Sequence, residues 1–424
     1  MPEIIPFKAY HYNTTKKLEL ENVLAPPHDV ISPAERIGFQ QKSPYNIIHL
    51  ILPDSYPVAG QVLNDLIKNK IVIQRNSPAF YIYGTKNRFN GVEFMRYGLV
   101  ALVKLYEFSA KQIFPHEKTF KKVAEGRLNL LRETQANFNP IFFIFNGSST
   151  YSKIIQKYTK KSPFFKTLDG DKVEHLLWLI EDRHDIEALQ TFFKSIPITI
   201  ADGHHRYLAA LMHSQENGSK HIMGLLVDIN DPGLVILPTH RQILRVPYLN
   251  AEEILNRLQE YFQIEEFRFE NSNAKEKVSQ ALDRLSKSPP NSYGMTMQNS
   301  STVFILTPKS DFHPESLIHG NWSEDWKRLD ASVLHEFILR ELLGVPEEIE
   351  DSKNIIYTKN INDAIQDVVA GKFQLLFILK PTKVEQILKI TAKSELMPHK
   401  STYFYPKPLS GLVFYKWNAN SQEQ

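Results

Sequence analysis

The sequence contains no cysteine among its 424 residues. This absence excludes disulfide bonds, thiolate catalysis, cysteine-ligated zinc and iron–sulfur clusters. No apolar run approaches the roughly 18 residues that a transmembrane helix needs, so we expect no membrane span. The first residues, Met1 to Phe7, lack a basic start and a long apolar stretch and are therefore not a secretion signal. Together these absences favour a cytoplasmic protein.

The chain also lacks a strong excess of either charge. It has 50 basic and 47 acidic residues, and its net charge is +3. Because proteins that bind nucleic acid usually carry a basic stripe, and none is evident here, we do not expect a nucleic-acid partner. Hydrophobic residues make up 42% of the chain, which is enough for large buried cores. The length predicts two or three domains.

Short apolar runs alternate with helical patterns and predict a mixed α/β fold. Residues 140–145, 197–201 and 223–228 read as buried strands, whereas proline-rich residues 4–60 predict an extended path of loops and short strands. Long helical patterns begin near residue 250, at 251–262 and 273–286. We therefore expect a motif-bearing α/β domain over 1–250 and a second α/β domain over 251–424. The second domain should pack against the first and return its C-terminal segment to the site.

The most informative segment is Ile198 to Tyr207, in which Asp202-Gly203 follows a predicted strand and His204-His205-Arg206 begins a predicted helix. A glycine there lets the backbone turn sharply, and the first N–H groups of a helix attract anions. Arg206 can hold a phosphate or carboxylate through two hydrogen bonds. Adjacent histidines at a helix start point about 100° apart, which argues against one shared zinc ion. The alternative is a capped helix with surface histidines.

Four further segments carry polar groups that could line the same site. They are Ala25-Pro26-Pro27-His28-Asp29-Val30, Pro115-His116-Glu117-Lys118-Thr119, Leu237-Pro238-Thr239-His240-Arg241, and residues 397–408 with Lys400 and Lys407. The His-Glu pair can supply a base or a metal ligand. The last segment could close over an anionic ligand. For each segment the alternative is a structural role, as a strand edge, a loop or a packed terminal arm.

Taken in this order, these segments resemble the bacterial and archaeal family catalogued as domain of unknown function 1015, from about residue 4 to 416. One departure is His28, where the family more often has Tyr. The segment Asp202 to Arg206 is also similar to the phosphate-binding motif of the ParB/sulfiredoxin superfamily, which includes nucleotide-dependent free-serine kinases. The resemblance implies a ParB/sulfiredoxin-like fold for the motif-bearing part. The activity of sulfiredoxin itself is excluded, because it needs a cysteine.

The residues and the resemblance together predict a small-molecule phosphotransferase that uses ATP or ADP, with Mg²⁺, on serine or a related hydroxylated metabolite. The predicted catalytic residues are His116, Glu117 and Asp202, with Asp202 also as metal ligand. The predicted anion- and nucleotide-binding residues are Gly203, His204, His205, Arg206, His240, Arg241, Lys400 and Lys407. The alternative is a regulatory protein that binds a nucleotide or phosphometabolite without turnover. A third hypothesis, nucleic-acid binding, rests on the ParB likeness alone. The sequence leaves the oligomeric state open.

Overall fold

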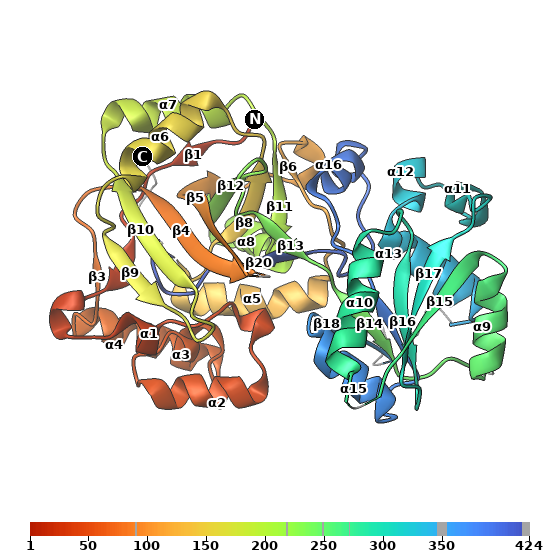
Figure 1. Cartoon of the computed structure of the whole chain (residues 1–424). Helices are drawn as coiled ribbons and strands as arrows, with labels where there is room; N and C mark the ends of the chain where they lie inside the picture. The colour runs from red at the N-terminus through yellow and green to blue at the C-terminus, as the bar shows by residue number, and fades with distance from the viewer. Residues whose placement is uncertain (90, 218, 248–249, 271, 346–353, 418–424) are drawn as a thin grey trace. The chain divides into compact units, whose positions relative to one another are not determined.

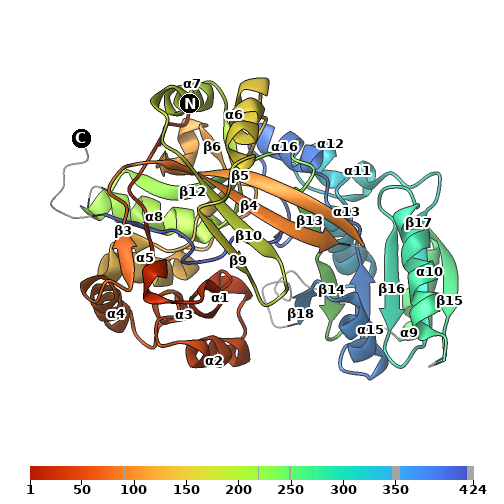
Figure 2. The same cartoon turned by 60° about the vertical axis from the view of Figure 1, so that its left-hand side comes forward.

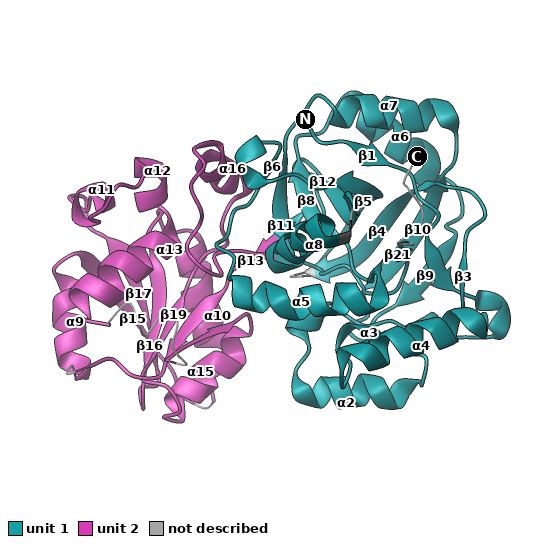
Figure 3. Cartoon of the chain, turned by 180° about the vertical axis from the view of Figure 1, so that it is seen from behind, with its two compact units in different colours: residues 1–235, 404–424 teal, residues 236–403 magenta. Residues whose placement is uncertain are grey.

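The computed structural model describes residues 1–89, 91–217, 219–247, 250–270, 272–345 and 354–417. The chain forms two compact units, coloured in Figure 3: unit 1 comprises residues 1–235 and 404–424, and unit 2 comprises residues 236–403. The sequence placed the break at 250. In the structure the chain leaves unit 1 at β13 (Val235–Leu237) and returns at β20 (Tyr403–Tyr405), so the segment from Phe404 onward belongs to unit 1.

Unit 1 is built on a large mixed sheet with the strand order β6-β11-β8-β12-β5-β4-β10-β9, and β1 pairs with β5. Its strands are β1 (Ile4–Ile5), β4 (Phe80–Phe89), β5 (Val92–Lys104), β6 (Ile113–Phe114), β8 (Ile141–Phe145), β9 (Phe165–Leu168), β10 (Glu174–Ile180), β11 (Ile198–Asp202) and β12 (His221–Asp228). β8 and β12 run parallel, whereas β11 runs antiparallel to β8. The strands predicted at 140–145, 197–201 and 223–228 are confirmed as β8, β11 and β12. Two small sheets join β2 (Tyr10–Tyr12) to β3 (Val72–Gln74) and β7 (Ala136–Asn137) to β21 (Tyr415–Lys416).

Four helices cover one face of this sheet: α5 (Lys121–Thr134), α6 (Ser149–Thr159), α7 (Arg183–Phe193) and α8 (His204–Asn217). Their apolar side chains recur at helical spacing, as Leu128 and Leu131 do on α5, and they enter one core with alternate residues of the strands. α5 and α8 lie side by side in both views (Figures 1 and 2). On the opposite face, Phe142 contacts Phe404, and Tyr83 accepts a hydrogen bond from the backbone of Leu409. The C-terminal segment therefore covers the face that the helices leave.

Helices fill the first part of unit 1. They are η1 (Thr14–Lys16), α1 (Leu20–Val23), η2 (His28–Val30), α2 (Pro33–Lys42), α3 (Ile48–Ile51) and α4 (Tyr56–Lys68), and η3 (Phe108–Ala110) follows later. The helical pattern from Val58 to Lys70 predicts α4, whereas the prolines before it predict loops and short strands. The prediction was wrong for α2, because Pro33 occupies the first turn, where its missing N–H costs nothing. Ser32 and Glu35 complete a reciprocal capping box at the same end.

Unit 2 is a second α/β layer structure on an antiparallel sheet with the order β15-β17-β16-β19-β14-β18. Its strands are β14 (His240–Ile243), β15 (Phe262–Arg268), β16 (Tyr293–Met297), β17 (Thr302–Pro308), β18 (Ile355–Thr358) and β19 (Leu375–Ile378). Its helices are α9 (Ala251–Gln259), α10 (Ala274–Ser286), α11 (Pro314–Leu317), α12 (Glu324–Lys327), α13 (Asp330–Ser332), the π-helix η4 (Val333–Leu342), α15 (Ile361–Val369) and α16 (Val384–Ala392). The mixed α/β class is thus confirmed in both units. Within the described ranges, no helix is both long and apolar enough to cross a membrane.

Candidate functional site

The turn between β11 and α8 is a sharp reversal at Gly203. Its φ of +93° lies in the region that side chains disfavour, and a Cβ added there would lie 2.9 Å from Cζ of Arg206 and 3.0 Å from Cδ1 of Ile141. The strand therefore ends and the helix begins within one residue. The first N–H groups of a helix have no intrahelical acceptor, and those of α8 lie at this turn together with the positive end of the helix dipole.

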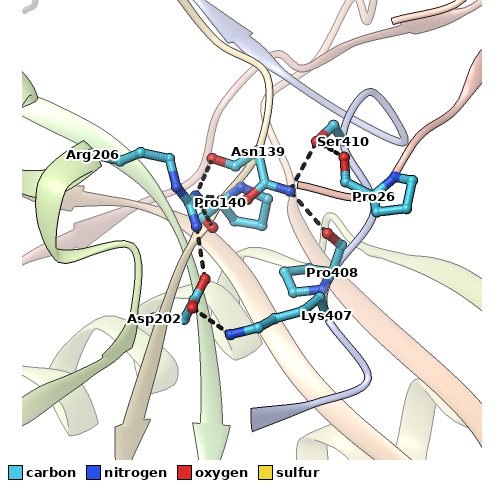
Figure 4. Close-up of polar contacts among 8 residues, drawn as sticks. All are labelled: Pro26, Asn139, Pro140, Asp202, Arg206, Lys407, Pro408 and Ser410. Atoms are coloured by element: carbon cyan, nitrogen blue, oxygen red, sulfur yellow. Dashed lines mark hydrogen bonds and ion pairs between the residues drawn. The ribbon is translucent and has the colours of Figure 1, made fainter. Parts of the chain in front are cut away.

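Asp202, the last residue of β11, is the electrostatic centre of the site. One carboxylate oxygen accepts a hydrogen bond from Nη2 of Arg206 at 2.9 Å, and the other accepts one from Nζ of Lys407 (Figure 4). The side chains of Asp202, Arg206 and Lys407 are only 13%, 12% and 8% exposed. Burial alone would raise the pKa of Asp202, but the charges of Lys407 and Arg206 outweigh it and lower the pKa to about 2.

Arg206 also forms hydrogen bonds with the loop that leads into β8. Its Nη1 donates to Oδ1 of Asn139 at 2.6 Å and to the carbonyl of Pro140 at 2.8 Å. Nδ2 of Asn139 in turn donates to the carbonyl of Pro408 at 2.9 Å and to Oγ of Ser410 at 3.2 Å (Figure 4). Much of the Arg206 guanidinium is thus occupied by protein acceptors, so part of its role is to hold neighbouring segments in place.

The Pro26-Pro27 segment joins the same network. Oγ of Ser410 donates to the carbonyl of Pro26 at 3.2 Å (Figure 4). The backbone N–H of Ser410 donates to the carbonyl of Ala25 at 2.8 Å. His28 follows directly in η2. Burial, and then the positive charges of Arg127 and Arg206, lower the pKa of His28 to about 3, so this imidazole is neutral near pH 7.

The two histidines of α8 bind the loop that contains His116 and Glu117. Nε2 of His204 accepts the backbone N–H of His116 at 3.2 Å, and Nε2 of His205 accepts the backbone N–H of Phe120 at 3.1 Å. These Nε2 atoms are acceptors and cannot donate to an anion. Anion binding by His204 and His205 would therefore depend on their backbone N–H groups and Nδ1 atoms.

His116 is fully buried against His204, with ring centroids 4.6 Å apart. Its Nδ1 donates to the carbonyl of Ile200, 2.5 Å away, so Nδ1 is the protonated nitrogen of the neutral ring. Burial lowers the pKa of His116 to about 4, and burial beside His116 keeps the pKa of His204 well below its usual value. Both rings are therefore neutral at physiological pH.

Glu117 lies beside this pair. Its Oε1 is 3.9 Å from Nε2 of His116, and its side chain is 20% exposed. The structure thus places His116 and Glu117 next to the turn that carries Asp202, Gly203, His204, His205 and Arg206, and it brings Lys407 to Asp202 from the end of the chain. The catalytic and anion-binding roles of these residues stay predictions.

The other predicted site residues belong to unit 2. His240 accepts the backbone N–H of Leu379 through Nδ1, and burial lowers its pKa to about 4. Arg241 is 1% exposed and donates to the carbonyls of Thr239 and Lys400. Nζ of Lys400 lies 4.9 Å from the centre of the Tyr357 ring. Their predicted anion-binding roles stay predictions.

Three residues at the unit 1 site were not predicted from the sequence: Arg127, Asn139 and Ser410. Asn139 precedes Pro140 at the start of a buried strand, which was a local signal for an ordered loop. Arg127 is part of an otherwise ordinary helical pattern and gave no such signal. Ser410 lies beyond the segment that was singled out, and only its contacts identify it.

A bound metal ion would need several carboxylate or imidazole ligands close together. In the described part of the chain, the one group of three potential ligands close enough to share an ion is Asp182, His184 and Asp185, and two of these are exposed. At the site, both oxygens of Asp202 already accept hydrogen bonds from cations. A divalent ion at Asp202 would have to displace one of them.

The protein is thus a mixed α/β protein. Its candidate anion-binding site is a glycine turn before a helix, next to a buried carboxylate that two cations hold. The family model described as "Protein of unknown function (DUF1015)" matches residues 4–332. The chain therefore belongs to the DUF1015 family, as its motifs predicted. No curated protein matches the chain.

Several solved structures match the chain at low similarity. A free serine kinase in complex with AMP is 16% identical, with 71% of this chain and 89% of that chain covered and a TM-score of 0.33. A conserved hypothetical protein from Pyrococcus furiosus is 16% identical, with 70% and 90% covered and a TM-score of 0.32. C-terminally truncated SbnI from Staphylococcus aureus is 11% identical, with 74% and 87% covered and a TM-score of 0.34. At these values the likeness carries no argument about individual residues or activity.

Proposed function

We propose that this protein is a small-molecule phosphotransferase that binds the phosphate groups of a nucleotide at the N-terminus of α8. The observation that carries the proposal is the Gly203 turn, which presents the first N–H groups of a 14-residue helix beside Arg206 and Lys407. Phosphoryl transfer depends mainly on positioning and on stabilising negative charge, and such a turn supplies both.

Within this proposal Glu117 is the general base for the hydroxyl of the acceptor. It lies on the loop that His204 and His205 fix to α8, so its position relative to the bound phosphate would be set by two hydrogen bonds. Asp202 would bind Mg²⁺ with the nucleotide, in which case Lys407 must withdraw. Serine is the first acceptor to test, because segment 202–206 is similar to the motif of free-serine kinases.

The test is to incubate the full-length protein with L-serine, Mg²⁺ and either ATP or ADP, and to follow phosphoserine by ³¹P NMR. Glu117→Gln should lower turnover by about 10²–10⁴-fold and leave nucleotide affinity nearly unchanged, since a general base acts in the transition state. Glu125→Gln, on the exposed side of α5, is the matched control and should behave like the natural protein. Normal turnover by Glu117→Gln would remove Glu117 from the mechanism.

The second candidate function is nucleotide or phosphometabolite sensing without turnover. One observation favours it: Asp202 is held by two cations, and the rings of His116, His204 and His205 are hydrogen-bonded to backbone groups. These groups serve the architecture of the turn. If the protein binds AMP, ADP or ATP and forms no product with either donor, the sensing function replaces phosphotransfer.

A further inference from the structure

A cavity in unit 1 lies beside the candidate site and contains a cation that the sequence did not reveal. Its volume is ≈ 50 Å³, and its wall includes Arg127, Arg206 and His28 together with apolar residues such as Leu131 and Ile222. A water needs about 10–15 Å³ of such space, so the cavity holds about three to five waters. That is room for a group of the size of a carboxylate or phosphate.

Within the described part of the chain, Arg127 is the cation of this wall that forms no ion pair, although the more distant charge of Asp29 acts on it. It comes from α5, and its Nη1 donates to the carbonyl of Ile51 at 3.0 Å. Among the described residues, no carboxylate lies within ion-pair distance of Arg127, whereas Arg206 is paired with Asp202 at 2.9 Å. A guanidinium has five N–H donors, so Arg127 keeps several for a ligand.

The local charge balance also favours an anion. The lining of the cavity, as far as the described residues form it, carries two cationic side chains, Arg127 and Arg206, and no carboxylate, and the exposed Asp29 acts on Arg127 from outside this lining. His28 is neutral and contributes none. The apolar part of the wall lowers the local dielectric, and an oxyanion pairs with a guanidinium more strongly in such surroundings than in water.

We propose that Arg127 and this cavity form an oxyanion subsite next to the first turn of α8, which accepts a phosphate or carboxylate group of a small-molecule ligand. The subsite rests on the proposed function only in taking that ligand to be a reactant. Phosphate and carboxylate present similar oxygen pairs to a guanidinium fork, so the experiment must separate them.

The experiment titrates the full-length protein with inorganic phosphate, AMP and L-serine separately by calorimetry. Arg127→Gln should weaken the binding of at least one of these ligands tenfold or more, and Arg127→Lys, which keeps the charge but loses the fork, should weaken it less. Arg132→Gln is the matched control, because Arg132 lies on the same helix, is 45% exposed and pairs with Glu216. It should leave all three affinities unchanged.

Weaker phosphate and AMP binding with unchanged serine binding would assign the subsite to a phosphate group. The reverse result would assign it to the carboxylate of the acceptor. Unchanged affinities in both Arg127 variants, or binding of none of the three ligands by the natural protein, would overturn the proposal. Loss of anion binding in Arg127→Gln without turnover by any form would uphold the subsite and reject phosphotransfer. Turnover by the natural protein with unchanged ligand affinities in both Arg127 variants would uphold phosphotransfer and reject the subsite.

Discussion

The ion pairs of Asp202 can be tested by a double-mutant cycle with Lys407. Asp202→Asn removes the carboxylate that two largely buried cations, Lys407 and Arg206, share. Removing one partner of a buried pair costs about 3–5 kcal/mol, because the remaining charge stays desolvated. Lys407→Met should cost less, since Asp202 keeps its hydrogen bond with Arg206 at 2.9 Å.

The contribution of the carboxylate itself follows from its pKa, which is lowered from 3.8 to about 2. A shift of that size corresponds to about 2–2.5 kcal/mol at pH 7. Because the folded-state pKa lies below the unfolded one, this stabilisation is present above about pH 4 and is lost as the pH falls towards 2. In Lys407→Met the pKa of Asp202 should rise, so the protein should lose less stability than the natural protein does between pH 4 and pH 2.

The assay is urea unfolding of the full chain at pH 7, with amide hydrogen exchange over β11 and α8 reporting on unit 1. The double mutant should be more stable than the sum of the single effects predicts, with a coupling energy of about 1–3 kcal/mol. Lys166→Met is the control, because Lys166 is 60% exposed in its pair with Glu174, and it should change the free energy of unfolding by less than about 1 kcal/mol. Additive effects of Asp202→Asn and Lys407→Met would refute the reasoning.

Two further predictions concern the turn and the histidines. Gly203→Ala should destabilise unit 1 by about 2–4 kcal/mol, because alanine disfavours the left-handed backbone there and its Cβ would crowd Arg206 and Ile141. The control in the same unfolding assay is Gly38→Ala on α2, where an added Cβ meets open space. It should be neutral or stabilising by up to about 1 kcal/mol. Burial lowers the pKa of His116 to about 4. Its contribution to the free energy of unfolding is therefore present above about pH 6.5 and is lost as the pH falls towards 4. Between pH 7 and pH 5 the loss amounts to about 2 kcal/mol. His116→Asn should flatten that part of the measured pH profile, and an unchanged slope would show that His116 is not the titrating group.

Local sequence signals were sufficient where a feature depends on neighbours in the chain. The strand before Asp202, the glycine turn and the helix after it follow from an apolar β-branched run, a flexible residue and a helical pattern. α5 follows from the spacing of Leu128 and Leu131. The proline-rich start was misread for the same local reason: proline disfavours a helix interior, but it suits the first turn, as Pro33 does in α2.

The sequence by itself determined the strand–glycine–helix turn and the residue types that surround it, but only the tertiary structure decided what each polar group binds. His204 and His205 accept backbone N–H groups 88 and 85 residues away, and Lys407 reaches Asp202 across 205 residues. Nothing in the local pattern specifies such partners, because they depend on which loops the sheet order brings together. Because buried polar groups are almost always hydrogen-bonded, the folded chain pairs these residues with one another. Arg127 lines the cavity and has no carboxylate partner among the described residues.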